Sequence, residues 1–287
     1  MAPLATLRFR LLITLAMHII AFRDQLYLRA AARKGLVQPP VTNLSSMIYS
    51  QDQTLEAASL QPRDPPIAAV LIFHGIGEQL TYWQSVQTLL AQHGIASLVF
   101  HYSGYGKSPG TITPYNLHRN AHAAYAALRQ IVPSNTPIFL LGFSMGTAVA
   151  ADSASHLSPP AQGLILCEGF PTLREAAACI ASSSVLARLL PDIWRTVDTV
   201  QTLTQPLLIV HSDSDGLFPA EFAHRIYRSA NSQQTHPAEL FLATGFSHNE
   251  PYQNPRLAYW QPILDFISRH AALHANASSL HVQTPSD

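Results

Sequence analysis

Hydrophobic residues in this chain fall into short continuous runs that alternate with longer segments of helical spacing. Runs such as Val70-Leu71-Ile72-Phe73 and Ile138-Phe139-Leu140-Leu141 have no polar residue on either face, which is typical of strands buried on both sides of a parallel sheet. Their alternation with helices predicts an α/β fold, a mostly parallel central sheet with helices on both faces. The predicted strands are residues 69–74, 96–102, 137–142, 161–167, 206–212 and 238–242, and the predicted helices are residues 81–92, 116–131, 144–156, 219–229 and 256–271.

Both ends of the chain depart from this alternation. Residues 1–41 predict a helical N-terminal extension, and residues 46–49 and 54–58 predict a weak hairpin that opens the main domain. We expect the main domain over residues 42–275, because an α/β chain of this length usually forms one large core. The polar residues 276–287 predict a disordered tail.

The segment Gly142-Phe143-Ser144-Met145-Gly146 directly follows one of the buried runs and has the pattern G-x-S-x-G. In a nucleophile elbow, this pattern places a serine on a sharp turn between a strand and a helix. Glycines are needed there because the backbone is strained and passes close to neighbouring elements. The pattern therefore favours a nucleophilic serine over the alternative, an ordinary Gly-Ser turn before a helix.

A serine hydroxyl is a weak nucleophile at neutral pH. Ser144 would therefore need a base, an acid that orients the base, and donors for an oxyanion. In folds with such an elbow, the acid and then the histidine follow the serine, each after a strand. The predicted strand 206–212 is followed by Asp213 and Asp215, and the predicted strand 238–242 is followed by His248. The chain thus supplies both partners in the required order.

These motifs resemble those of the α/β-hydrolase superfamily, and most of all its small-lid, serine-aminopeptidase-like branch. The resemblance covers about residues 46–271. The family motif H-G-x-x-D-x-x-x-P matches His211–Pro219, with Ser212 in place of the usual glycine, and implies that Asp215 is the acid. The family motif G-x-x-H ends at His248 and implies that this residue is the base.

Two other carboxylates compete with Asp215 for the role of the acid. Asp213 lies in the same loop, and its alternative role is that of a turn or helix-cap carboxylate. Glu168 follows the predicted strand 161–167, and some α/β hydrolases carry the acid after that strand. The resemblance favours Asp215.

The oxyanion site has a signature of its own. The first buried run ends in His74-Gly75-Ile76, which is similar to the strand followed by H-G-x of the family. The resemblance implies that the backbone N–H groups of Ile76 and Met145 hold the oxyanion. We interpret His74 as a brace of the turn. Glu78 is interpreted as a carboxylate at the start of a helix, with a substrate contact as the alternative.

The alternation is interrupted between about residues 170 and 205, where this superfamily inserts its lid. Apolar residues there keep a spacing compatible with helices, and Pro171 and Pro191 divide the segment. The segment is either a short helical cap over an acyl pocket or a plain pair of helices packed on the core, and the sequence leaves both open. The candidate pocket residues are Phe170, Leu186, Leu190 and Trp194.

Composition limits the function further. The chain has 287 residues, of which 47% are hydrophobic and 12% charged, and its formal net charge is +0. Since no basic stripe is present, nucleic acid is not an expected partner. The two cysteines give no disulfide framework, and the scattered histidines form no paired metal motif. We therefore expect no cofactor and no metal, and a small-molecule acyl substrate.

The N-terminal extension contains the uncharged stretch Leu11–Phe22. A transmembrane helix needs about 20 apolar residues, so this stretch is too short to predict a span. Three roles stay open: the hydrophobic region of a signal peptide, an interfacial helix that contacts anionic lipid through residues 8–34, and a helix packed on the domain. The expected location is the cytoplasm, with membrane association through this segment as the open alternative.

The predicted function is that of a serine hydrolase that cleaves a carboxylic ester, or a thioester or amide, through a Ser-His-Asp triad and an acyl-enzyme intermediate. Esterase or lipase-like activity is favoured. The alternatives are an acyltransferase with the same triad, an aminopeptidase-like amide hydrolase, and a catalytically silent scaffold of the same fold. The sequence predicts neither the acyl chain nor the oligomeric state.

Overall fold

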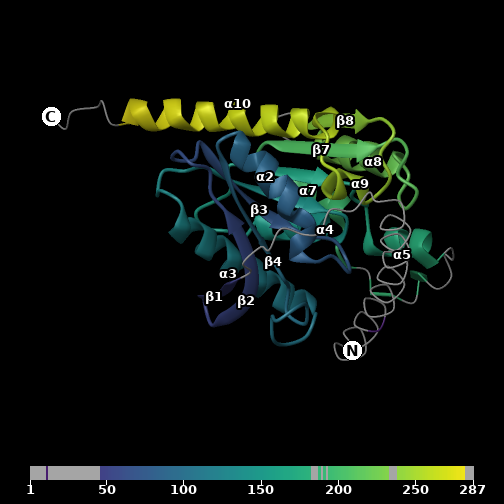
Figure 1. Cartoon of the computed structure of the whole chain (residues 1–287). Coiled ribbons are helices and arrows are strands. Elements are labelled where there is room, and N and C mark those ends of the chain that lie inside the picture. Colours follow the sequence, from purple (N-terminus) through teal and green to yellow (C-terminus); the bar gives the residue numbers. More distant parts are fainter. Residues whose placement is uncertain are drawn as a thin grey trace, which may run out of the picture.

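One mixed sheet forms the centre of the molecule, as a computed structural model of the chain shows (Figure 1). The structure describes residue 11 and residues 46–181, 187–188, 190–191, 193–232 and 238–281. The strands are β1 (Ser46–Ser50), β2 (Gln53–Leu60), β3 (Ala68–Phe73), β4 (Ile95–Phe100), β5 (Ile138–Phe143), β6 (Gly163–Cys167), β7 (Leu207–Ser212) and β8 (Glu239–Ala243).

The order of the strands across the sheet is β1-β2-β4-β3-β5-β6-β7-β8. Strand β2 runs antiparallel to β1 and β4, and every other neighbouring pair is parallel. The α/β fold predicted from the alternation of elements is thus confirmed, and so is the opening hairpin. Because the strands from β3 to β8 are all parallel, the loops that leave their carboxyl ends meet at one edge of the sheet.

Helices cover both faces of the sheet. Helices α3, α4, α7 and α8 pack into the hydrophobic cluster on one face, and η1, α2, α9 and α10 pack into the cluster on the other. Their bounds are η1 (Leu80–Trp83), α2 (Gln84–Gln92), α3 (Pro114–Ile131), α4 (Met145–Ala154), α5 (Leu173–Ala181), α7 (Thr196–Thr202), α8 (Glu221–Ala230), α9 (Glu250–Gln253) and α10 (Leu257–His281).

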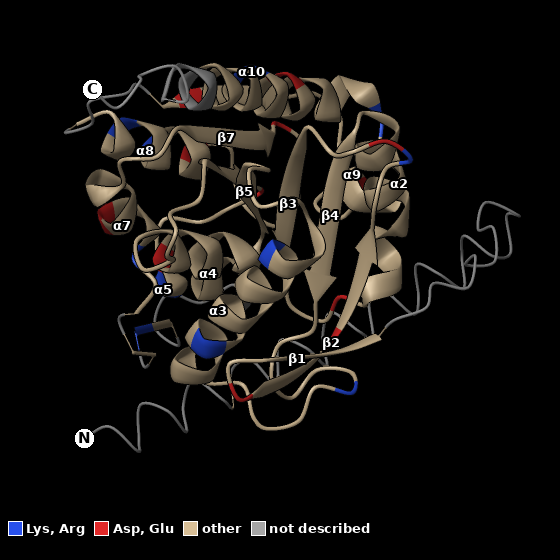
Figure 2. Ribbon diagram, turned by 90° about the vertical axis from the view of Figure 1, so that its left-hand side faces the viewer, with Lys and Arg blue, Asp and Glu red and all other residues tan. Residues whose placement is uncertain are grey.

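The central strands are buried because their sequences are apolar on both faces. All residues of β3, β4, β5, β6 and β7 are buried, and none of these strands contains Lys, Arg, Asp or Glu. In β3, Leu71 packs into one cluster while Val70 and Ile72 pack into the other, since successive side chains of a strand point to opposite faces. Figure 2 accordingly shows charged residues mainly on the outer helices and loops.

The C-terminal helix is longer than the sequence predicted. Helix α10 continues to His281, whereas the sequence predicted a disordered tail from residue 276. Figure 1 shows its C-terminal end projecting beyond the sheet. The segment from 270 to 277 is rich in alanine, and alanine has the highest helix propensity, which outweighs the polarity that was interpreted as disorder. Residues 282–287 lie outside the described residues.

The predicted N-terminal extension, residues 1–41, lies outside the described residues apart from Leu11. Its contact with a membrane surface through residues 8–34 therefore stays a prediction. Within the part of the chain that the structure describes, no helix combines the length and the hydropathy required to cross a bilayer.

Candidate active site

Ser144 sits on a strained turn between β5 and α4. Its backbone has a φ of 52° and a ψ of −118°. Residues other than glycine rarely adopt this backbone conformation, which costs about 1–3 kcal/mol. The flanking glycines make the turn possible. A Cβ on Gly142 would lie 2.6 Å from the Cα of Thr147, and a Cβ on Gly146 would collide with the carbonyl oxygen of Phe73. The sharp strand-to-helix turn expected from G-x-S-x-G is therefore present.

The side chains of Ser144, His248 and Asp215 form one chain of hydrogen bonds. They come from the loops that follow β5, β8 and β7. The Nε2 of His248 lies 3.0 Å from the Oγ of Ser144, and its Nδ1 lies 2.7 Å from the Oδ2 of Asp215. The imidazole can thus donate from Nδ1 to the carboxylate while its Nε2 accepts a proton from the serine hydroxyl.

Asp215 is held as an anion although it is buried. Burial alone would raise its pKa, but the hydrogen bond and the charge of His248 outweigh burial and lower the pKa to about 2. The other carboxylate oxygen, Oδ1, accepts from the backbone N–H groups of Leu217 at 2.7 Å and Phe218 at 3.1 Å. Three N–H donors therefore fix both the charge and the orientation of this carboxylate.

The two competing carboxylates have other partners. Asp213 is exposed, and its Oδ1 accepts from the Gly245 N–H and the Ser214 hydroxyl, as a turn carboxylate does. Glu168 is fully buried and accepts from the Ser212 N–H and the Tyr259 hydroxyl. Of the three carboxylates considered from the sequence, Asp215 is the one hydrogen-bonded to His248.

The loop after β3 lies directly against the turn of Ser144. A Cβ on Gly75 would lie 3.2 Å from the Cβ of Ser144, so a larger residue would require one of the two segments to shift. Met145 is the first residue of α4, and the first N–H groups of a helix have no acceptor within the helix itself. Ile76 is partly buried against the core. The two backbone N–H groups expected to hold an oxyanion thus belong to segments that meet beside Ser144.

Comparisons with known proteins agree with this architecture. An esterase of Pyrococcus furiosus has a similar fold, with a TM-score of 0.64 and 18% identity over 79% of this chain and 92% of the esterase. A carboxyl esterase of Bacillus coagulans gives a TM-score of 0.65 and 14% identity over 82% of this chain and 100% of that chain. The family described as serine aminopeptidase, S33, matches residues 64–199. These comparisons support the α/β-hydrolase superfamily, whose fold this chain shares. This result confirms the resemblance inferred from the sequence motifs.

Proteins that are similar in sequence match part of this chain. An uncharacterized protein of Mycobacterium tuberculosis is 29% identical over 186 residues, which are 64% of this chain and 63% of that protein. The lysophosphatidylserine lipase ABHD12 of Danio rerio is 25% identical over 192 residues, which are 59% of this chain and 50% of the lipase. The matched region thus spans about half to two thirds of the length of these relatives.

Two further polar residues support the loop after β3. His74 is buried, and its Nδ1–H donates to the Gly75 carbonyl at 2.7 Å, while the Tyr102 hydroxyl donates to the His74 carbonyl at 3.0 Å. Burial lowers the pKa of His74 to about 3, so the ring is neutral and acts as a brace. Glu78 is also buried and accepts from the Trp83 indole N–H at 2.8 Å, an anchoring role that neither sequence interpretation included.

The candidate pocket residues do not share one environment. Phe170 and Trp194 pack with Phe218, whose ring lies 5.6 Å from that of Phe170 and 5.3 Å from that of His248. Leu190 packs into a different small cluster against α5. Leu186 lies outside the described residues. Sequence reasoning did not single out Phe218, although it stands in the matched motif just before Pro219.

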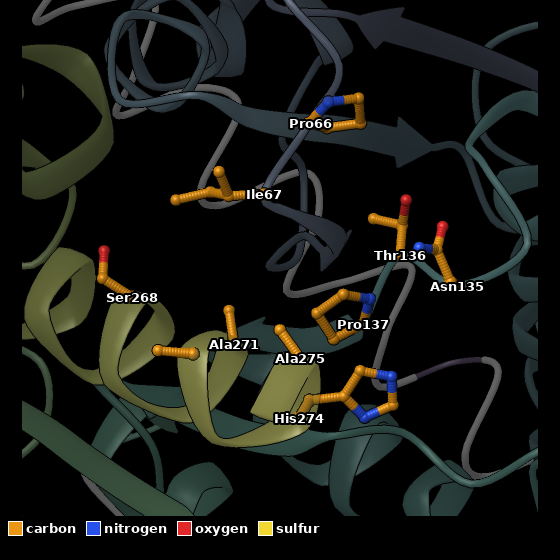
Figure 3. Close-up of a pocket in the computed structure, with 10 residues that line it drawn as sticks. Pro66, Ile67, Asn135, Thr136, Pro137, Ser268, Ala271, His274 and Ala275 are labelled. Atoms are coloured by element: carbon orange, nitrogen blue, oxygen red, sulfur yellow. The ribbon is translucent and has the colours of Figure 1, made fainter. Parts of the chain in front are cut away.

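A surface pocket of about 610 Å³ lies away from these residues (Figure 3). It opens between α10 and the segments that precede β3 and β5, at the end of the strands opposite to Ser144. Its lining residues are Pro66, Ile67, Asn135, Thr136, Pro137, Ser268, Ala271, Ala272, His274 and Ala275. Its lining contains none of the residues predicted for catalysis.

Proposed function

We propose that this protein is a serine hydrolase that cleaves carboxylic esters, with Ser144 as nucleophile, His248 as base and Asp215 as the orienting acid. One observation carries the proposal. The serine hydroxyl, the imidazole and the carboxylate are joined at 3.0 Å and 2.7 Å, within hydrogen-bonding distance for the transfer of a proton. The strained backbone of the serine and its place between a buried strand and a helix add support.

The reaction proceeds in two acyl transfers. The Ser144 Oγ attacks the ester carbonyl carbon while the Nε2 of His248 takes the hydroxyl proton. The backbone N–H groups of Ile76 and Met145 stabilise the oxyanion, and one such donor typically contributes about 3 kcal/mol in the transition state. His248 then returns the proton to the leaving alcohol. Water attacks the acyl-enzyme by the reverse route and releases the acid.

The substrate class is a carboxylic ester of a small or medium acyl chain, with a thioester or amide as chemically equivalent alternatives. The proposal is supported by the similar proteins, which include esterases and a lysophosphatidylserine lipase. Phe170 and Trp194 are the proposed pocket residues, because they share the hydrophobic cluster of Phe218 beside His248. No cofactor is required for this chemistry.

A fluorophosphonate probe tests the proposal. We expect the purified protein to be labelled, and Ser144→Ala and His248→Ala to lose labelling. Ser155→Ala is a matched control at the exposed end of α4 and should be labelled like the wild type. Labelling that survives Ser144→Ala would contradict the assignment, and an unlabelled but folded wild type would favour a silent scaffold.

A panel of substrates then separates the related activities. Hydrolysis of esters ahead of thioesters and aminoacyl amides is expected for an esterase. Preferential cleavage of the amides would instead indicate the aminopeptidase-like alternative. Added alcohol acceptors distinguish hydrolysis from acyl transfer, because an acyltransferase would divert most of the acyl product to the alcohol.

A further inference from the structure

A second carboxyl group, Glu168, lies buried beside the acid of the proposed triad. It follows β6, is 0% exposed and has a φ of 50°, which is rare for a residue with a side chain. One side-chain nitrogen or oxygen atom from each of Glu168, His211 and Asp215 lies within 4.8 Å of the corresponding atoms of the other two. The two-step mechanism described above makes no use of Glu168 or His211, so the presence of a second carboxyl group needs its own explanation.

Two adjacent carboxyl groups in a dry site cannot both be charged without a large penalty. Asp215 is the better place for the single negative charge, because it accepts from His248 and from the N–H groups of Leu217 and Phe218. The Oε1 of Glu168 accepts from the Ser212 N–H at 3.0 Å and from the Tyr259 hydroxyl at 2.8 Å, and its Oε2 lies 3.2 Å from the same Ser212 nitrogen, so Glu168 has two donors where Asp215 has three. The uneven supply of donors assigns the charge to Asp215 and the proton to Glu168.

His211 supports the same assignment through its own hydrogen bonds. Its Nε2 lies 3.1 Å from the carbonyl oxygen of Phe218, which can only accept, so Nε2 carries the proton. Burial lowers the pKa of His211, and the neutral ring therefore has a lone pair on Nδ1. That atom lies 3.6 Å from the Oε2 of Glu168. A charged carboxylate would repel this lone pair, whereas a carboxylic O–H would be attracted to it.

The remaining titratable neighbours leave Glu168 without a cation. They are Cys167 on β6 and Tyr259 on α10, and burial raises the pKa of both, so both are neutral near pH 7. Among the described residues that face Glu168, none therefore offsets a negative charge on it. Burial, and next the hydrogen bond and charge of Asp215, raise the pKa of Glu168 itself.

We propose that Glu168 is a neutral carboxylic acid that positions Asp215, and through it His248, by presenting an O–H to the buried pair Asp215–His211. The inference rests on the proposed function. Glu168 is fully buried and hydrogen-bonded to Ser212 and Tyr259, so we assign it the role of a positioning residue. Its carbonyl oxygen accepts hydrogen bonds from the Ser212 N–H and the Tyr259 hydroxyl. Because the other oxygen is protonated, Asp215 carries the single negative charge of the two carboxyl groups.

The substitution Glu168→Gln tests the protonation state directly, because an amide is neutral and keeps both a donor and an acceptor. We expect kcat/KM of E168Q to stay within about threefold of the wild type, with the acidic limb of its pH profile unmoved. If Glu168 were charged, E168Q would remove a negative charge near the histidine and move that limb to lower pH. A displacement of about half a pH unit or more would overturn the proposal.

Removal of the whole group tests the positioning role. We expect Glu168→Ala to lower kcat/KM about tenfold relative to E168Q, because the Asp215 carboxylate loses its support. Equal activity of the two variants would show that Glu168 does not position the triad. If E168A fails to fold, the comparison of wild type with E168Q still decides the protonation state.

Infrared difference spectroscopy keeps this inference separate from the proposed function. The wild type minus E168Q spectrum at neutral pH should contain the C=O band of a protonated carboxylic acid. The matched control is Glu221→Gln, since Glu221 is exposed and paired with Arg228, and its difference spectrum should contain carboxylate bands instead. Carboxylate bands for Glu168 would overturn the inference, even in a protein that cleaves no ester.

Discussion

Two neighbouring regions of this molecule are built in different ways. The first is the set of loops that leave β5, β7 and β8, where Ser144, Asp215 and His248 are each fixed by hydrogen bonds. The second is the insertion between β6 and β7, about residues 168–206, where α5 contributes to two small hydrophobic clusters and α7 packs into the main core. In the first region the proposed catalytic groups are fixed by directional hydrogen bonds, whereas in the second the side chains of the candidate pocket residues Phe170 and Leu190 are held by apolar packing.

The difference between the two regions separates chemistry from specificity. Hydrogen bonds require specific donor and acceptor positions, so the proposed catalytic groups tolerate little change. Apolar clusters tolerate substitutions of similar volume, so the insertion can vary while the fold is kept. Phe218 joins the two regions, because its N–H holds Asp215 while its ring contacts both Phe170 and His248. Substitutions on either side of Phe218 should therefore have effects of different kinds.

The largest effect is expected from Asp215→Asn. The amide cannot accept the Nδ1–H of His248 as a carboxylate does, and it favours the wrong tautomer of the ring, so kcat should fall about 10⁴-fold. Steady-state kinetics on the best ester of the substrate panel measures this loss. The matched control is Asp213→Asn in the same loop, whose carboxylate is exposed and bonded to Gly245. A comparable loss in both variants would mean that the loop, and not the charge on Asp215, matters.

The next prediction compares two buried residues of the insertion. Phe170→Ala and Leu190→Ala should each lower the free energy of unfolding by about 3 kcal/mol, because each leaves a cavity. We expect only Phe170→Ala to lower kcat/KM as well, by about tenfold, since Phe170 supports Phe218 beside His248. Urea unfolding and ester kinetics on the same samples measure both quantities. Equal kinetic losses in the two variants would remove the distinction between the two clusters.

The sequence predicted the candidate site residues where a motif directly follows the end of a predicted strand. Ser144, Asp215 and His248 could be named because each stands at a fixed offset from a glycine, a proline or another histidine after an apolar run. The proton on Glu168 could not be predicted, because it depends on Tyr259, which lies far along the chain, and on the tautomer of His211. The environment of Leu190 was equally inaccessible, since helical spacing does not tell which of two clusters a side chain joins.

The same limits apply to the elements of the fold. The alternating apolar runs predicted the parallel strands, because burial on both faces leaves a simple pattern. The end of α10 was missed, because polar residues in a helix resemble those of a disordered segment. Alanine content was the signal that could have shown the helix continuing to His281.

The smallest effect we predict concerns stability at acidic pH, and it places the acid sensitivity in the strand-end region. The pKa of Asp215 is lowered from 3.8 to about 2 in the folded protein. This shift contributes about 2 kcal/mol to the free energy of unfolding. The contribution is fully present above the pKa of the unfolded state and is lost as the pH falls through the pKa of the folded state. The pKa of Glu168 is raised, so its contribution to stability has the opposite pH dependence. That contribution is fully present below the ordinary pKa of 4.5 and is lost as the pH rises through the pKa of the folded state.

Urea unfolding of the wild type and Asp215→Asn from pH 4 to pH 2 measures the contribution of Asp215 to the free energy of unfolding separately from that of Glu168. We expect the wild type to lose about 2 kcal/mol more than the variant over this interval, because the asparagine does not titrate. The control in the insertion is Glu175→Gln, which removes a partly exposed carboxylate paired with Arg225 and should leave the wild-type slope unchanged. A flatter slope in Glu175→Gln than in Asp215→Asn would place the acid-sensitive group in the insertion. The contrast between a bonded catalytic edge and a packed insertion would then no longer hold.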